Sequence, residues 1–308
     1  MPANDPFSNL RLVLRRQILE MLSGDPDGEP AWVRAMSEGS DKGYFGPKSA
    51  VWHVNGHISV IVGGIRALLM QTLHPGAMAG VHDHSRYATD PLGRLSGTVR
   101  WVVTTTFGST ETVRKELTRV EKMHSRVKGS FQTEIGDETL QNYSAQDLDL
   151  ITWVHVVFTD AFLGAHQVWG DQIPAEFGGE SGADRYVREW SKAGELMGLT
   201  NPPKSLLELE RCLANFQPVL RSDERVQEAV SFLKNPPIPL IARVPYWILM
   251  QGAISTLRPI FRSMLGLKSP RWPAPFCAGL MLRIISRTLG TESTSRKRAV
   301  ERIERLKK

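Results

Sequence analysis

Helical spacing of apolar residues is the feature that most restricts the fold of this chain. Apolar side chains recur three or four positions apart over long stretches, whereas strand-like alternation bounded by turn pairs is scarce. One apolar run covers 61–73 and ends at His74-Pro75, because proline disfavours helix in the residue before it. Further helices are expected at 91–106, from Gly108-Ser109 to Gly129, from Ser144 onward, and at 184–197 and 205–215. The sequence therefore predicts an all-α protein.

The chain length of 308 residues allows one large domain or two small ones. We expect a single large helical domain with an N-terminal helical segment (1–50), a core (51–235) and a C-terminal helical segment (236–308) packed on the core. Residues 235–245 (NPPIPLIARVP) are predicted to form an extended linker, since prolines are frequent there. The longest uncharged stretch, 244–257, has 14 residues, whereas a bilayer span needs about 20, so we interpret it as a buried helix.

Positive charge is concentrated near the C-terminus. Residues 229–308 hold fifteen Lys or Arg against three acids, so a chain of net charge +6 carries −6 over its first 228 residues. A basic, apolar and tryptophan-bearing segment suits an anionic membrane surface; solvated helix faces are the alternative. Nucleic acid is not expected as a partner, because no nucleic-acid motif accompanies the charge.

The sequence has two cysteines and no apolar stretch of signal-peptide length near its start, features typical of a protein in a reducing compartment. We therefore expect a cytoplasmic protein that is either free or peripheral at a membrane.

All eight histidines fall between His53 and His166, and two of them occupy positions where helical spacing demands an apolar residue. His124 follows the stripe of Val113, Leu117 and Val120, and His155 lies between Ile151 and Phe158 on another stripe. A neutral imidazole that faces an apolar cavity can bind haem iron, and it can also bind zinc or non-haem iron. The simpler interpretation is a histidine packed in the core.

Motifs for other metal sites or for hydrolysis are incomplete. There is no HExxH, and Glu121 with His124 makes one Glu-x-x-His pair where di-iron carboxylate bundles need two. The chain has no GxSxG element, and the glycines at 63–64 lack the ending of a phosphate loop. Haem binding, a non-haem metal and a metal-free scaffold remain the three alternatives from the residues alone.

Five segments together resemble the MpaB / rubber oxygenase (latex-clearing protein) catalytic-domain family. They are GGIRALLMQ at 63–71, which closes at His74-Pro75, HDHSRYATDPLGRLSGT at 82–98, VEKMHSRVKG at 120–129, YSAQD at 143–147 and WVHVVFTD at 153–160. The resemblance covers roughly 50–290 and keeps the motif order of the family. It implies a globin-like helical core that holds non-covalent haem b, and oxygenase chemistry with O₂ on hydrophobic, often isoprenoid, substrates.

The resemblance also implies roles for individual residues. The Arg-x-x-x-Thr element matches Arg94 and Thr98, which are expected close to the haem and are the candidate catalytic residues. The proximal haem histidine matches His124, and the next motif histidine matches His155, expected beside the pocket rather than on the iron. Rubber-cleaving members carry a lysine just before that threonine, whereas this chain has Gly97.

The sequence therefore predicts a haem b-dependent oxygenase, or an oxygenase-like protein, that acts on a lipophilic substrate. Two alternatives stay open: a non-catalytic haem-binding or haem-sensing protein at a membrane surface, and a helical protein that binds a non-haem metal. The expected membrane contact is made through residues 229–308.

Overall fold

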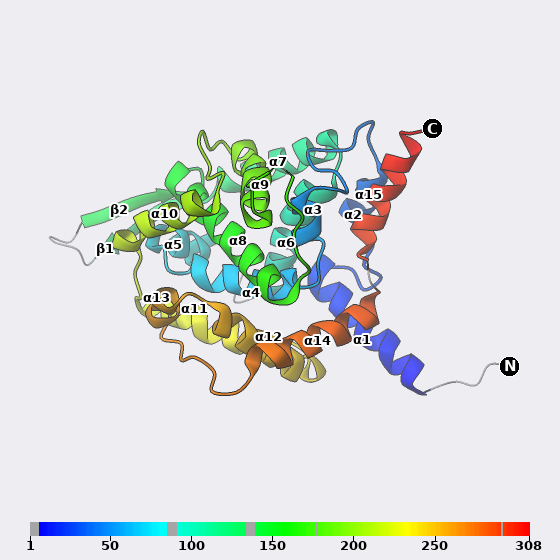
Figure 1. Ribbon diagram of the computed structural model, residues 1–308. Coiled ribbons are helices and arrows are strands. Elements are labelled where there is room, and N and C mark those ends of the chain that lie inside the picture. The colour runs from blue at the N-terminus through cyan, green and yellow to red at the C-terminus, as the bar shows by residue number, and fades with distance from the viewer. Residues whose placement is uncertain (1–5, 85–90, 134–138, 177, 291) are drawn as a thin grey trace.

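The computed structural model describes residues 6–84, 91–133, 139–176, 178–290 and 292–308. Fifteen α-helices, two 3-10 turns and one two-stranded hairpin make up the regular structure of these residues, so the predicted all-α class is confirmed (Figure 1). The globin-like arrangement and the division at residues 50 and 235 remain predictions.

The elements follow one another along the chain with these bounds. They are α1 (Pro6–Ser23), α2 (Ala31–Arg34), η1 (Ala35–Ser37), α3 (Ala50–Asn55), α4 (Val60–Gln71), α5 (Pro75–His84), α6 (Pro91–Phe107), α7 (Thr110–His124), β1 (Lys128–Thr133), β2 (Thr139–Ser144), α8 (Leu148–Trp169), α9 (Gly182–Leu196), α10 (Leu206–Phe216), η2 (Gln217–Val219), α11 (Glu224–Lys234), α12 (Leu240–Thr256), α13 (Pro259–Met264), α14 (Ala274–Leu289) and α15 (Thr294–Arg305).

Helices α4 and α8 form the centre of the core. Glycine at position 63 permits their close approach, because a Cβ there would lie 2.7 Å from Phe162 Cδ1 and 3.1 Å from Phe162 Cα. Among the described residues α8 is the one helix long and apolar enough to span a membrane, yet 67% of its apolar window is buried within the protein. Its apolar length is thus accounted for by packing against the helices around it.

Helices α12 and α14 form an outer layer that lies below α4 and α8 in Figure 1. A Cβ on Gly252 of α12 would lie 2.5 Å from Ala278 Cβ of α14, so these small residues bring the helices together. Trp169, at the end of α8, donates from its indole Nε1 to the Pro275 carbonyl oxygen at 2.8 Å. The predicted linker at 235–245 is wrong from Leu240 onward, because α12 begins there and retains Pro245 in its second turn, while Leu249, Met250 and Ala253 pack on the core.

A buried ionic cluster joins the outer layer to the centre. The Asp160 carboxylate of α8 pairs with Arg66 of α4 at 3.0 Å and with Arg258, the residue before α13, at 2.9 Å. The Arg66 and Asp160 side chains are 4% and 7% exposed. Burial lowers the pKa of the Arg66 guanidinium, and the nearby Asp160 carboxylate opposes that shift. This carboxylate therefore connects the core helices with the start of α13.

The C-terminal helix α15 holds the N-terminal segment against α6. Arg302 is fully buried and donates to the carbonyl oxygens of Asp41 at 3.0 Å and Phe107 at 2.8 Å, and also to that of Met36. Arg298 pairs with Glu29 at 3.1 Å. Several cations of the basic tail are thus used within the fold.

A hairpin separates α7 from α8. Strands β1 and β2 pair antiparallel, with Lys128 opposite Ser144. The predictions of a helix that reaches Gly129 and of a new helix from Ser144 are therefore wrong: α7 ends at His124 and α8 begins at Leu148. The Asp147 carboxylate accepts a hydrogen bond from the Ser144 backbone N at 2.7 Å, and the Ser144 hydroxyl accepts one from the Gln146 backbone N at 3.2 Å, so both side chains stabilise the turn before the helix.

Candidate functional site

A cavity of about 830 Å³ lies among α5, α6, α7, α8 and α9. Its volume falls in the usual range of ligand sites, roughly 300–1,000 Å³. Its wall is formed by Gln71, Ala77, Gly80, Val81, His84, Gly97, Thr98, Trp101, Arg119, Val120, Lys122, Met123, His124, Arg126, Val127, Ala145, Leu150, Ile151, Val154, His155, Phe158, Trp190, Ala193 and Met197. The wall therefore combines apolar side chains with eight polar or charged ones.

Helix α7 carries His124 to the cavity. The helix begins after Ser109, whose hydroxyl accepts a hydrogen bond from the Thr112 backbone N at 3.3 Å. Val113 and Val120 are buried on the stripe that the sequence identified, and His124 is half-buried in the last turn. The stripe therefore ends on a histidine in the cavity wall.

His155 enters the same cavity from α8. Burial lowers the pKa of its imidazole to about 4, so the ring is neutral near pH 7. Its Nε2 is buried and has no hydrogen-bond partner among the described residues. A Cβ on Gly194 of α9 would lie 3.1 Å from that nitrogen, which indicates that Nε2 faces the α9 backbone.

Three of the four site residues expected from the sequence share this cavity. Thr98 lines it from α6, as the histidines do from α7 and α8. The backbone of Arg94 belongs to α6, but its side chain lies outside the described residues. The structure thus brings together His124, His155 and Thr98, and their roles remain predictions.

Three cations in the cavity wall were missed by the sequence analysis: Arg119, Lys122 and Arg126. Arg119 donates to the buried Glu116 carboxylate at 2.6 Å, and Arg100 donates to its other oxygen at 2.7 Å. The positions 119, 122 and 126 follow the helical spacing beside the apolar stripe, so this pattern was available in the sequence.

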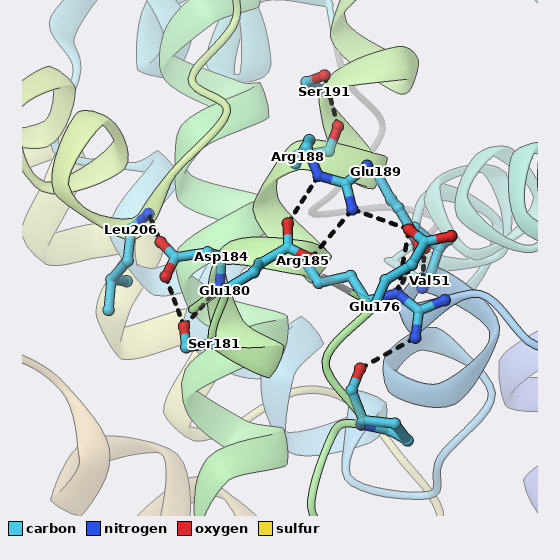
Figure 2. A network of polar contacts seen from close by, with 11 residues as sticks. Val51, Glu176, Glu180, Ser181, Asp184, Arg185, Arg188, Glu189, Ser191 and Leu206 are labelled. Carbon is cyan, nitrogen blue, oxygen red and sulfur yellow. Dashed lines mark hydrogen bonds and ion pairs between the residues drawn. The ribbon is translucent and has the colours of Figure 1, made fainter. Parts of the chain in front are cut away.

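The α9 wall is held by a network of ion pairs (Figure 2). Arg188 pairs with Glu180 at 2.7 Å and with Glu176 at 3.0 Å. Arg185 pairs with Glu189 at 2.8 Å and donates to the Pro174 carbonyl oxygen at 2.9 Å. These contacts fix the loop before α9 to the helix that supplies two residues of the wall, Trp190 and Ala193.

A second group of histidines lies away from the cavity. The ring centroid of His166 is 5.0 Å from that of His53 and 5.1 Å from that of His57. His166 Nε2 donates to the Asp171 carbonyl oxygen at 2.9 Å, and burial lowers its pKa to about 4. Six of the eight histidines therefore lie in two separate places, three in the cavity wall (His84, His124 and His155) and three in this second group.

The cavity residues fit haem b. A histidine in an apolar cavity suits the iron, and cationic side chains at the wall suit the propionate carboxylates. Across the described ranges, no three His, Cys, Asp or Glu side chains form a group that could hold a metal ion.

These features define a class of protein: an all-helical protein with a histidine-bearing apolar cavity. The family model described as "ER-bound oxygenase mpaB/B'/Rubber oxygenase, catalytic domain" matches residues 52–287, so the chain belongs to this family. The resemblance drawn from the five motifs is thereby confirmed. No curated protein and no solved structure gives a significant match.

Proposed function

We propose that this protein is a haem b-dependent oxygenase that uses O₂ on a lipophilic substrate of isoprenoid or lipid type. The family description supports an oxygenase catalytic domain. The observation that carries the proposal is the meeting of His124, His155 and Thr98 in one apolar cavity with cations in its wall.

Different cavity residues would bind the iron and the propionates of the cofactor. When bound, haem b supplies an iron centre for dioxygen chemistry. His124 would ligate the iron from the end of α7, and Arg119, Lys122 and Arg126 are available to pair with the propionates. Glu116 orients Arg119 by accepting from it.

Thr98 and His155 act beside the cofactor in this proposal. The Thr98 hydroxyl would donate a hydrogen bond at the haem edge, together with Arg94. His155 would stay neutral and off the iron, because its Nε2 faces the α9 backbone and burial disfavours the imidazolium.

The substrate would lie against the apolar wall. Trp101, Val154, Phe158 and Trp190 supply apolar surface, which favours a lipophilic molecule. At Gly97 an added Cβ would meet no other described residue within 4 Å, so among these residues space remains where rubber-cleaving members carry lysine. The proposal therefore does not extend to polyisoprene cleavage that depends on such a lysine.

The proposal is tested with purified protein loaded with haem b. We expect about one haem per chain, and O₂ consumption that depends on an added lipophilic alkene or lipid. Haem uptake without substrate-dependent O₂ consumption across a panel of such compounds would favour the haem-binding or haem-sensing alternative. Failure to take up haem would contradict both.

A further inference from the structure

Helices α12 and α14 expose large apolar side chains on an outer layer of the molecule. Leu240, Val244 and Trp247 of α12 are exposed at steps of four and three, with Leu240 at 76%. Phe276, Leu280 and Ile284 of α14 are exposed at steps of four, with Phe276 at 71%. Both sets have the spacing of one helix face, so each helix presents an apolar face outward while its other residues pack inward.

The two faces belong to one surface. Helices α12 and α14 pack on each other, and the indole of Trp247 stacks on that of Trp272, the residue two positions before α14, with ring centroids 5.3 Å apart and planes 10° apart. In Figure 1 both helices run along the lower edge of the molecule, on the opposite side of α4 and α8 from α7. We call this surface, formed by these six apolar residues and Trp272, the α12–α14 face.

Exposed cations accompany the apolar residues. Arg243 lies on α12, Lys268 and Arg271 precede α14, and Arg283 lies on α14, and all four are exposed. They form no ion pair with the acids that the structure describes. No Asp or Glu occurs from 229 to 291, so the positive charge of this region has no acidic neighbours in the sequence.

We infer that the α12–α14 face docks on an anionic lipid bilayer, with its apolar side chains in the interface and its cations among the headgroups. Tryptophans and apolar side chains beside lysine and arginine are the pattern of interfacial helices. A second copy of the same face is disfavoured, because it would bring uncompensated cations against cations. The inference stands on surface residues and does not depend on haem.

The basic tail is not part of this surface. Arg302 is buried, Arg298 pairs with Glu29, and Arg305 donates to the Ser37 carbonyl oxygen, so α15 holds the N-terminal segment. Deletion of the tail would therefore damage the fold. Point variants on α12 and α14 give the sharper test.

The experiment is co-sedimentation of the full chain with vesicles of phosphatidylcholine alone or with phosphatidylserine. We expect pelleting on the anionic vesicles, and weakening between 0.1 and 1 M salt because the Debye length falls from about 10 to about 3 Å. Arg243→Glu/Arg283→Glu should weaken the partition at least about tenfold. Phe276→Ser/Leu280→Ser should weaken it by at least about tenfold as well, because two apolar side chains are lost.

Matched controls distinguish binding through this surface from effects of net charge and from non-specific hydrophobic binding. Lys307→Glu/Lys308→Glu makes the same charge change in the exposed tail, and Leu207→Ser removes an apolar side chain that is 55% exposed on α10. Both should bind like the wild type. The inference is overturned if the protein pellets equally with neutral and anionic vesicles, or if it does not pellet with anionic vesicles at low salt. It is also overturned if the control variants lose as much vesicle binding as the α12 and α14 variants. It is also overturned if the face instead mediates self-association that the same variants abolish.

Discussion

Removal of the Asp160 charge tests how the buried ionic cluster stabilises the fold. In Asp160→Asn the amide keeps nearly the same shape, but the Arg66 guanidinium, 4% exposed and 3.0 Å from the carboxylate, loses its counter-charge. Breaking a buried ion pair on one side costs about 3–5 kcal/mol. We expect a loss of this size in the free energy of unfolding, measured by urea titration at pH 7.

An exposed pair of similar length provides the control. Glu111 and Lys115 approach to 2.7 Å, but their side chains are 67% and 70% exposed. Glu111→Gln should cost far less than Asp160→Asn, because water screens the exposed pair. In Arg66→Met/Asp160→Asn much of the stability should return, since Arg258 keeps Glu210 at 3.6 Å and no buried charge is left. If Asp160→Asn costs no more than Glu111→Gln, the reasoning about burial is wrong.

Three further predictions concern the cavity and the C-terminal helix. Gly97→Ala should raise the free energy of unfolding by up to about 1 kcal/mol, because the residue lies in a helix and has room for a Cβ. A lower free energy of unfolding in urea titration would contradict the presence of that room. His155 favours the folded state above its ordinary pKa of 6.5, and this stabilisation, up to about 3 kcal/mol, is lost as pH falls from 6.5 toward 4. The free energy of unfolding of His155→Leu should therefore differ less between pH 7 and pH 4.5 than that of the wild type. An equal difference would refute the lowered pKa of His155. Arg302→Met should lower the free energy of unfolding by about 3 kcal/mol or more, because it leaves buried carbonyl oxygens without a donor. Lys307→Met should have little effect in the same urea titration.

Local sequence patterns were sufficient for most core helices. The stripe from Val113 to His124 predicted a helix whose buried face reaches the site, and Ser109 marked its start. The hairpin after α7 was missed because its strands are short and polar, and because the expected helix was extended to Gly129 although Gly136-Asp137 is a turn pair. Helix α12 was missed in part because prolines near its start suggested an extended segment, whereas packing on α14 and α4 favours helix.

Site residues were predictable where the residue spacing within a single helix marks them. His124 and His155 stand out as polar residues on apolar stripes, and the family motifs added Thr98. That these residues surround one cavity depends on how α6, α7 and α8 pack, and no local pattern gives that arrangement. The same holds for α9: only its position brings Trp190 into the cavity wall and Gly194 next to His155.

The most direct test of the haem proposal is a haem titration followed at the Soret band for four proteins. The wild type and His155→Ala should retain about one haem per chain after gel filtration, whereas His124→Ala should lose it because the iron loses its protein ligand. His82→Ala, which changes a histidine outside the cavity wall, is the control and should behave as the wild type. If His155→Ala loses haem and His124→Ala keeps it, the assignment of the iron ligand is contradicted.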